Sequence, residues 1–211
     1  MDVVIVDYGT GNLRSVYKAL EAAGENFNDL KISISGFPNI IAKADKIILP
    51  GQGSYKRCMD SILLVDGLYE ELNKFVQIKK KPLFGICVGM QLFSKEGYEE
   101  KKTKGFNWVE GIVEKIRLKD KNFKLPHMGW NNLNIIKKHK IFEGIEQNSH
   151  FYFVHSYKFS IKNKEKILGT TNYEDDIISC IGDDNIFGTQ FHPEKSHKNG
   201  IKLLSNFLKY Y

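Results

Sequence analysis

A cysteine held between two glycines is the first feature of this sequence that is suited to chemistry. The stretch Gly85-Ile86-Cys87-Val88-Gly89 follows an apolar run and has the form G-x-C-x-G. Flanking glycines allow a tight strand-to-helix turn that lifts the central sulfur out of a sheet and aims the following helix, expected over 88–93, at the site. The pattern predicts that Cys87 is a nucleophile, with the backbone N–H of Val88 directed at an oxyanion. The alternative is a small core residue, since cysteines after apolar strands are often buried.

A histidine and a glutamate lie two residues apart near the C-terminus, in His192-Pro193-Glu194. The preceding run, residues 186–191, is typical of a strand, and in an extended segment residues i and i+2 lie on the same side. Both side chains are therefore expected to reach one pocket. There His192 would take the thiol proton and return it to a leaving amine, while Glu194 orients the imidazole. An isolated His-Pro-Glu is usually a solvated turn, so this assignment depends on the cysteine elbow upstream.

A third stretch, Leu49-Pro50-Gly51-Gln52-Gly53, ends an apolar run with a glycine-rich turn. In a doubly wound sheet the site lies beyond the carboxyl ends of the strands, which places this turn beside Cys87. The backbone of Gly51, Gln52 and Gly53 is therefore a candidate to donate an N–H to the oxyanion. By itself the pattern indicates only a turn, so this assignment also depends on the other two stretches.

The elements that must position these residues alternate between strands and helices in the first half of the chain. Strands are expected at 3–6, 30–34, 46–49 and 83–86, and helices at 13–23, 55–64 and 68–79. Asn12 is suited to cap the first of these helices and Gly24 to end it. Strands that alternate with helices indicate a parallel sheet covered on both faces.

After about residue 105, short apolar runs joined by turns replace this alternation. Strands are expected at 111–118, 131–136, 151–159, 167–171, 177–181 and 186–190, followed by a helix over 199–208. We therefore expect an α/β fold with a doubly wound, mostly parallel sheet flanked by helices and an added antiparallel or mixed portion. No internal repeat, low-complexity tract or linker divides the chain, so one domain is expected over 1–211.

The size and charge of the chain limit the classes of function. Its 211 residues, 42% hydrophobic and 27% charged, suffice for one domain with a full core. A net charge of +6 can indicate a nucleic-acid partner. The lysines, however, lie in scattered clusters with acids between them and without an aromatic-rich binding motif, which favours solvated loops and helix ends. A basic docking face for an acidic protein partner remains an alternative.

The cysteine content and the N-terminus indicate the compartment. Three cysteines at irregular spacing do not form a disulfide framework and fit a reducing cytoplasm. Cys58 and Cys180 lack flanking glycines and are expected to pack in the core. Residues 1–7 carry acids and no basic region, so no secretory signal is expected, and no apolar run is long enough to span a bilayer. The remaining histidines show no metal-ligand spacing, and neither a metal nor another cofactor is expected.

In several stretches the sequence resembles class I glutamine amidotransferases, which carry a Cys-His-Glu triad on an α/β sheet. More closely it is similar to the glutaminase subunits of imidazole glycerol phosphate synthases, and the resemblance covers the whole chain. The matching stretches lie at residues 7–12, 49–51, 85–92, 126–131, 152–157 and 190–196. The stretches Pro-His-Met-Gly-Trp-Asn and Tyr-Phe-Val-His-Ser-Tyr separate such subunits from the amidotransferases of purine, pyrimidine or folate synthesis.

The resemblance implies an activity and a partner. Glutamine would be hydrolysed to glutamate and ammonia through a thioester on Cys87, without a cofactor. A (β/α)8-barrel synthase subunit would dock over the glutaminase site as the other half of a heterodimer. It would receive the ammonia and form imidazole glycerol phosphate and AICAR in histidine biosynthesis.

The resemblance also implies roles for residues outside the triad. It places Gln91 and Glu99 at the amino-acid head of the substrate, with the segment His155-Ser156-Tyr157 along the same pocket. It places Asn12 and Lys195 at the surface that faces the synthase subunit. The patterns of the residues themselves point to the triad, whereas these further roles depend on the resemblance.

Two positions depart from the pattern of that family. The usual P-G-V-G loop carries Gln52 here, and the usual C-L-G elbow carries Val88. The second is a mild apolar exchange, whereas Gln52 lies where the backbone must turn to complete the oxyanion hole. Relatives that diverge at such positions also occur in surface-sugar pathways, where a similar pair of proteins supplies ammonia for an amidino group, and this is the first alternative function. A non-catalytic scaffold, which need not retain an intact triad, and a thiol hydrolase of similar fold are the others.

Overall fold

The computed structural model describes residues 1–211 and is built around an eight-stranded sheet with the strand order β2-β1-β3-β4-β14-β13-β12-β9. One half of this sheet is parallel: β1 (Asp2–Val6) pairs with β2 (Lys31–Ser35) and β3 (Lys46–Gly51), and β4 (Leu83–Cys87) pairs with β3 and β14 (Ile186–Thr189). The strands β1, β3 and β4 are largely apolar and almost fully buried, as expected when helices cover both faces of a sheet.

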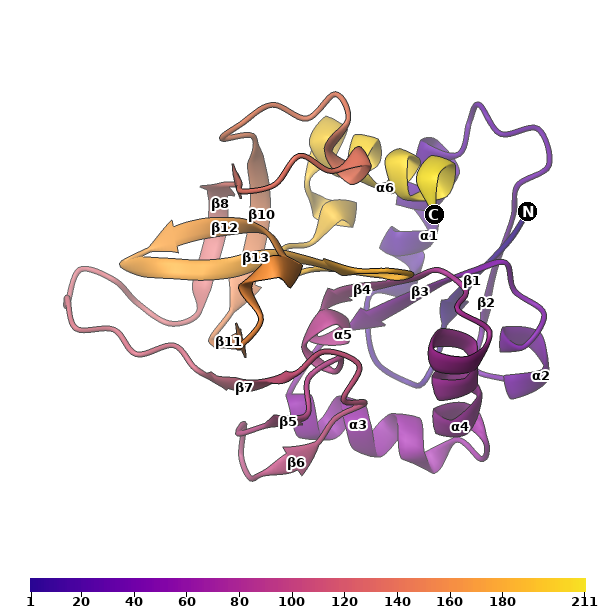
Figure 1. The fold of residues 1–211 in the computed structure, drawn as a ribbon, viewed down its shortest axis with the longest axis horizontal. Helices are drawn as coiled ribbons and strands as arrows, with labels where there is room; N and C mark the ends of the chain where they lie inside the picture. Colours follow the sequence, from indigo (N-terminus) through magenta and orange to yellow (C-terminus); the bar gives the residue numbers. More distant parts are fainter.

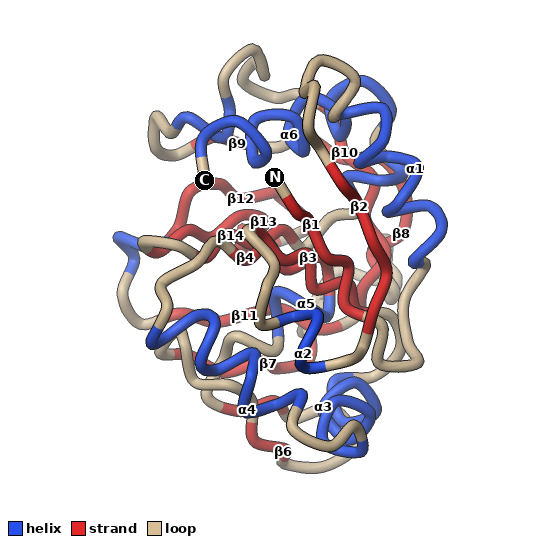
Figure 2. The backbone as a smooth tube through the Cα atoms, turned by 90° about the vertical axis from the view of Figure 1, so that its right-hand side faces the viewer, coloured by secondary structure: helices blue, strands red, loops and turns tan.

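Helices cover both faces of the parallel half. The helices α1 (Leu13–Ala23) and α6 (His197–Tyr210) lie on one face, and α2 (Pro38–Ile41), α3 (Tyr55–Leu64), α4 (Leu68–Asn73) and α5 (Val88–Gln91) lie on the other (Figures 1 and 2). A π-helical segment over Lys74–Ile78 continues α4 almost to the end of the helix predicted over 68–79. The doubly wound arrangement expected from the sequence is therefore confirmed.

The other half of the sheet is antiparallel, and two smaller sheets accompany it. The strands β12 (Ile167–Tyr173) and β13 (Asp175–Asp183) pair with each other and continue from β14, and β9 (Asn134–Ile135) forms the edge. One small sheet joins β8 (His127–Asn132) to β10 (His150–His155); the other contains β11 (Tyr157–Ile161), β7 (Gly111–Lys115), β5 (Glu96–Gly97) and β6 (Thr103–Lys104). Short 3-10 turns lie at Lys140–Phe142, Lys164–Lys166 and Pro193–Lys195. The antiparallel portion expected after residue 105 is thus confirmed.

Among the differences from the sequence patterns, two expected strands are divided and one expected helix is short. The strand expected over 131–136 is divided into two strands, β8 and β9. The sequence pattern does not predict that β8 begins at His127, because this stretch lacks the β-branched residues that are typical of strands. The strand expected over 151–159 is interrupted at Ser156, where the chain leaves β8 as a partner and joins β7. The helix expected over 88–93 is a single turn, α5. Local patterns do not report strand partners, and the short elements α2, β5 and β6 have too few residues for a periodic signal.

Core packing holds the strand ends that carry the site. Buried apolar side chains form a continuous cluster from β1 to α6. In its centre the ring of Phe84 on β4 lies 4.9 Å from that of Phe187 on β14 and 5.3 Å from that of Phe207 on α6. The carboxyl ends of β3, β4 and β14 are therefore held side by side at one edge of the sheet.

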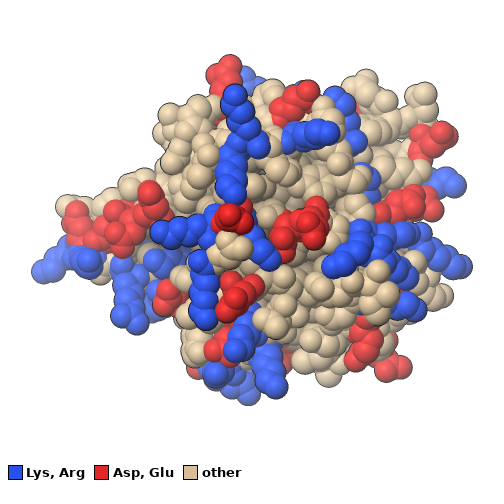
Figure 3. Space-filling view, viewed as in Figure 1, with Lys and Arg blue, Asp and Glu red and all other residues tan.

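The surface carries charges of both signs. On the face shown in Figure 3, groups of Lys and Arg side chains have Asp or Glu side chains beside them. The protein also contains ion pairs, such as Lys79 with Glu71 at 2.7 Å and Lys162 with Glu110 at 3.0 Å. This arrangement fits the scattered, solvated lysine clusters expected from the sequence. No helix of the structure has the length and apolar character needed to cross a membrane.

Candidate active site

Cys87 is the last residue of β4, and its backbone has φ +55° and ψ −112°, which an L-residue adopts only under constraint. Two close approaches impose this turn. A Cβ atom on Gly89 would lie 1.9 Å from the Leu49 carbonyl oxygen, and a Cβ atom on Gly51 would lie 2.4 Å from the Gly89 nitrogen. Only glycine fits at either position, so the elbow packs backbone against backbone on the end of β3. The strained turn predicted from G-x-C-x-G is therefore present.

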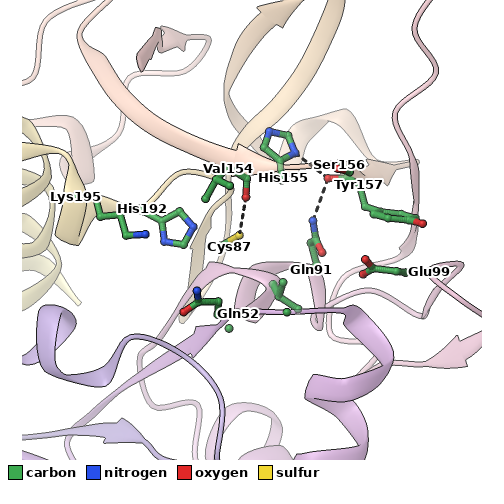
Figure 4. A pocket seen from close by; sticks show the side chains of 13 residues that line it. Gln52, Cys87, Gln91, Glu99, Val154, His155, Ser156, Tyr157, His192 and Lys195 are labelled. Atoms are coloured by element: carbon green, nitrogen blue, oxygen red, sulfur yellow. Dashed lines mark hydrogen bonds between the residues drawn. The ribbon is translucent and has the colours of Figure 1, made fainter. Parts of the chain in front are cut away.

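A cavity opens beside Cys87, and its walls come from segments far apart in the chain (Figure 4). Its lining residues are Gly51, Gln52, Gly53, Cys87, Val88, Gln91, Glu99, Val154, His155, Ser156, Tyr157, His192 and Lys195. All site residues predicted from the sequence line this cavity except Glu194 and Asn12. No group of three or more His, Cys, Asp or Glu side chains in the structure is arranged to hold a metal ion.

The Cys87 sulfur is contacted by two residues that the sequence reasoning did not single out. The thiol donates towards the Val154 carbonyl oxygen at 3.9 Å, and the Gln190 side-chain amide donates to the sulfur at 3.6 Å. Gln190 is fully buried and lies two residues before His192. A polar side chain at the end of an otherwise apolar strand is the signal that could have identified it. A backbone carbonyl such as that of Val154 leaves no sequence signal.

His192 and Glu194 are in contact, but not in the geometry that the sequence predicts. Nδ1 of His192 lies 2.8 Å from Oε1 of Glu194, and both side chains are almost fully buried. Because Pro193–Lys195 is a 3-10 turn rather than an extended segment, Glu194 contacts the imidazole from outside the cavity. The expectation that both side chains reach the pocket is therefore wrong. Pro193 favours the turn, since its ring fixes φ at a helical value.

The two histidines of the cavity have opposite electrostatic surroundings. Burial alone would lower the pKa of His192, but the Cys87 sulfur and the Glu194 carboxylate outweigh it and raise the pKa to about 10. Burial lowers the pKa of His155 to about 3, and its Nδ1 lies 2.8 Å from the Tyr157 carbonyl oxygen. At neutral pH His155 is uncharged, and its Nδ1 is occupied by this contact. His192 Nε2 is buried and has no hydrogen-bond partner, so it is the ring nitrogen available to exchange a proton.

Ser196 holds the turn that carries His192. Its hydroxyl donates to the His192 carbonyl at 2.6 Å and accepts the Tyr152 N–H at 3.0 Å. The His192 N–H in turn donates to the Tyr152 carbonyl at 2.9 Å. Strand β10 therefore sets the position of His192, although it lies well before His192 in the sequence.

The glycine-rich loop lies against the elbow, as the strand order predicts. Gly51 is the register partner of Cys87 in the parallel pairing of β3 with β4. Gln52 and Gly53 follow it, are exposed, and line the same cavity. This loop and Val88 therefore both line the cavity beside Cys87.

Two buried side chains hold the backbone of this loop through hydrogen bonds. The Tyr8 hydroxyl donates to the Pro50 carbonyl, and the Cys58 thiol donates to the Gln52 carbonyl at 3.6 Å. Burial raises the pKa of both Tyr8 and Cys58, so each remains protonated and able to donate. Cys58 is buried as expected, and it has this additional contact.

Gln91 and Glu99 present acceptors to one side of the cavity (Figure 4). The Gln91 amide uses its two N–H bonds inside the protein, towards the Tyr157 carbonyl at 3.1 Å and the Gln190 side-chain oxygen at 2.9 Å. Its own carbonyl oxygen is left for a ligand. Glu99 accepts the Tyr55 N–H with one oxygen at 2.7 Å, and burial raises its pKa. The arrangement is suited to bind a cationic group.

The two residues predicted to face a partner lie in different environments. Lys195 lines the cavity. Asn12 is exposed and caps α1, since its side-chain oxygen accepts the Ser15 N–H at 3.4 Å. It does not reach the cavity, but the glycine before it packs on Pro50 at the base of the glycine-rich loop.

Comparison with known proteins agrees with this fold. A model of the glutamine amidotransferase class-I family matches residues 4–210, and the chain belongs to this family. Relatives of this chain include imidazole glycerol phosphate synthase subunit HisH of Pelagibacter ubique (strain HTCC1062). That protein is 50% identical over 208 residues, which cover 99% of this chain and 99% of that protein. The subunit of the same name from Bradyrhizobium diazoefficiens is 40% identical over 214 residues, which cover 100% of this chain and 99% of that protein.

Solved structures share the architecture at low sequence identity. A structure described as a glutamine amidotransferase superposes with a TM-score of 0.72 at 20% identity, over 98% of this chain and 97% of that one. The glutaminase domain of Trypanosoma brucei CTPS gives a TM-score of 0.67 at 16% identity, over 99% and 94% of the two chains. This likeness supports the mostly parallel sheet flanked by helices.

Proposed function

We propose that this chain is the glutaminase subunit of an imidazole glycerol phosphate synthase. It hydrolyses glutamine to glutamate and ammonia and passes the ammonia to a synthase subunit in histidine biosynthesis. The observation that carries the proposal is the cavity in which Cys87 lies on a strained elbow beside His192, whose ring contacts Glu194 at 2.8 Å. Identity of 50% to a HisH subunit over nearly the whole chain supports this pathway among those that use glutamine.

The reaction proceeds through a thioester. His192 holds the proton that it has taken from the Cys87 thiol, as its raised pKa favours, and the resulting thiolate attacks the carboxamide carbon of glutamine. The tetrahedral intermediate collapses as His192 returns the proton to the leaving nitrogen, so ammonia departs and a γ-glutamyl thioester remains. His192 then deprotonates a water molecule that attacks the thioester, which releases glutamate and restores the thiol. Glu194 orients the imidazole and stabilises its positive charge.

The oxygen of the carboxamide becomes negatively charged in this intermediate, and backbone N–H groups stabilise it. We assign this role to Val88 at the elbow and to the loop Gly51-Gln52-Gly53. Because α5 is a single turn, its dipole contributes less than the helix expected over 88–93 would have done. The individual N–H groups therefore carry the stabilisation.

The substrate is held by its amino-acid head. Its ammonium group is positioned between the carbonyl oxygen of Gln91 and the carboxylate of Glu99, the two acceptors that face the cavity. The segment His155-Ser156-Tyr157 lines the same wall. A substrate bound there extends its carboxamide towards Cys87, since Gln91 lies one turn beyond the elbow.

The docking face for a barrel-shaped synthase subunit lies beside the cavity. The Lys195 ammonium lies 5.9 Å from the Tyr152 ring, which contacts the Trp130 ring at 5.9 Å, and Trp130 stacks on His197 at 5.2 Å. Trp130 is 48% exposed, and Met128, two residues earlier on the same face of β8, is 61% exposed. Exposed large apolar side chains that adjoin one another are typical of interfaces. A partner that covers this face would also close the cavity.

The state of the cysteines supports a cytoplasmic location. All three are free and buried, and the proposed mechanism requires Cys87 as a thiol or thiolate. Burial raises the pKa of Cys58 and that of Cys180, which makes both poor nucleophiles.

Covalent labelling tests the proposed nucleophile. The chain, mixed with its synthase partner, is treated with a glutamine-mimicking electrophile and mapped by peptide mass spectrometry. We expect a single label on Cys87 that excess glutamine prevents. A label on Cys58 or Cys180, or labelling that glutamine does not affect, would refute the assignment.

A further inference from the structure

His127 is a buried histidine that the proposed mechanism does not use. It is 3% exposed, lies at the start of β8, and does not line the cavity. The antiparallel register places it directly opposite His155, the last residue of β10. Nδ1 of His127 lies 3.0 Å from Nε2 of His155. The contact joins a residue outside the cavity to one on its wall.

The hydrogen bonds around these two rings have one consistent direction. The Tyr157 carbonyl, 2.8 Å from Nδ1 of His155, can only accept, so Nδ1 of His155 carries the proton. In a neutral imidazole the other nitrogen is then an acceptor, and Nδ1 of His127 must donate to it. Nε2 of His127 is left as an acceptor, and the Asn131 side-chain amide supplies a donor at 3.1 Å. Each ring therefore carries its proton on Nδ1.

Further contacts fix the end of this series of hydrogen bonds that lies farther from the cavity, at Asn131 and His127. The Asn131 amide also donates to the Asn172 carbonyl at 3.0 Å, and its oxygen accepts a backbone N–H at 2.8 Å, which sets its orientation. The His127 ring is stacked between Phe153 at 4.8 Å and Tyr173 at 4.0 Å. The geometry leaves the ring one position and one direction for its hydrogen bonds.

The inner end reaches the groups that we assign to substrate binding. The Tyr157 carbonyl accepts a second hydrogen bond, from the Gln91 side-chain amide at 3.1 Å. The other N–H of that amide donates to Gln190, whose own amide donates to the Cys87 sulfur. A chain of hydrogen bonds thus connects β8 with the glutamine side of the cavity.

We propose that His127 is a positioning residue for glutamine binding. The Nδ1–H of His127 holds His155 in the tautomer that donates to the Tyr157 carbonyl. That carbonyl in turn holds the Gln91 side chain with the amide oxygen towards the substrate ammonium. The identity of this substrate rests on the proposed function. Without this donor, Nε2 of His155 loses its partner and the ring can exchange its proton between nitrogens. The Tyr157 carbonyl would then lose one of its two donors.

The charge state of both rings fits this arrangement. Burial lowers the pKa of His127 to about 4, and burial lowers that of His155 to about 3 despite its bond to Tyr157. Both are therefore neutral at pH 7, as a chain with one donor and one acceptor per ring requires.

A matched pair of substitutions tests the proposal in the complex with the synthase subunit. In His127→Asn the amide can replace Nδ1–H as a donor to His155, whereas His127→Leu has a similar volume and no donor. We expect His127→Leu to raise the KM for glutamine by about tenfold or more, with a smaller change in kcat, because it leaves a buried acceptor unpaired. His127→Asn should stay within about threefold of the unsubstituted protein, since it restores the bond. Equal KM values for the two variants would overturn the proposal.

Imidazole ¹⁵N spectra of the unsubstituted protein provide a test that needs neither activity nor a variant that folds. At pH 7 we expect Nδ1–H tautomers for both His127 and His155. An Nε2–H tautomer of His155 would overturn the positioning role of His127 and leave the proposed function unaffected. Absence of glutamine hydrolysis by the unsubstituted complex would instead overturn the proposed function, and with it the substrate named here.

Discussion

At the scale of single residues, the surroundings of each imidazole decide what it can do. His192 has a carboxylate on Nδ1 and a sulfur close to its other side, and its pKa is raised to about 10. His155 has a carbonyl on Nδ1 and another imidazole on Nε2, and its pKa is lowered to about 3. Only the first is suited to accept a proton from a thiol and hold it during bond formation.

The first prediction follows from this difference. His192→Ala should lower kcat for glutamine hydrolysis by about 10³-fold or more, close to the loss in Cys87→Ala, because the two groups act as a unit. Glu194→Gln should lose less, by roughly 10²-fold, since it orients the ring without reacting. Steady-state ammonia release measures all three. Near-full activity of His192→Ala would show that another base serves the reaction.

The second prediction concerns stability and pH. Because the pKa of His127 is about 4 when folded and 6.5 when free, the unfolded chain binds more protons between these values. The free energy of unfolding should therefore fall as pH drops from 6.5 towards 4, with this residue contributing up to about 1.4 kcal/mol per pH unit. Urea denaturation at pH 7 and pH 5 should show a smaller difference for His127→Asn than for the unsubstituted protein. An equal difference would mean that His127 is not buried in its neutral form.

At the scale of elements, side chains hold the end of β3 and the loop after it at two points. The Pro50 and Gln52 carbonyls each accept a side-chain hydrogen bond, whereas the Gly51 carbonyl accepts none from a side chain. We propose that a rotation confined to the Gly51–Gln52 peptide exchanges that carbonyl for an N–H at the oxyanion position. The loop is therefore a candidate switch between a slow and an active glutaminase.

The third prediction tests this switch. Gln52→Val should fold normally, because the side chain is exposed, and should change the ratio of basal to partner-stimulated turnover. Gain or loss of one oxyanion donor changes rates by ~10²–10³, which sets the scale of the stimulation expected from the partner. Turnover is measured with and without the synthase subunit and its ligand. Equal rates in both conditions for the unsubstituted chain would refute the switch.

The sequence predicts some elements of this site better than others, for physical reasons. The cysteine elbow and the glycine-rich loop each carry a local pattern of glycines, and both are found where expected. The glycines themselves are required by contacts between the two segments, since Gly51 and Gly89 lie where the end of β3 packs against the elbow. The contact between His192 and Glu194 is also local, yet its 3-10 geometry depends on Ser196 and Tyr152, which sequence spacing does not connect. Strand pairing across β8 and β10 is non-local, and this is why the sequence, although it marks the stretch 126–131, does not indicate that His127 contacts His155.

At the scale of the whole molecule, the exposed face around Trp130 predicts where a partner binds. Trp130→Ala should weaken binding of the synthase subunit by about tenfold or more, because large aromatic residues dominate interface energies. Leu64→Ala is the matched control, since Leu64 is 84% exposed at the C-terminal end of α3, away from this face. Isothermal titration calorimetry measures both. Equal affinities for the two variants would place the docking face elsewhere.

Transfer of labelled nitrogen shows directly whether this chain supplies ammonia to its partner. The complex of this chain with its synthase subunit is given amide-¹⁵N glutamine in the presence of excess unlabelled ammonium, and the imidazole glycerol phosphate formed is analysed by mass spectrometry. A glutaminase that delivers ammonia directly to its partner predicts product that is almost fully labelled, and no labelled product with Cys87→Ala. Product without label, or label diluted to the level of the free ammonium, would show that the synthase subunit takes its ammonia from solution and not from this chain.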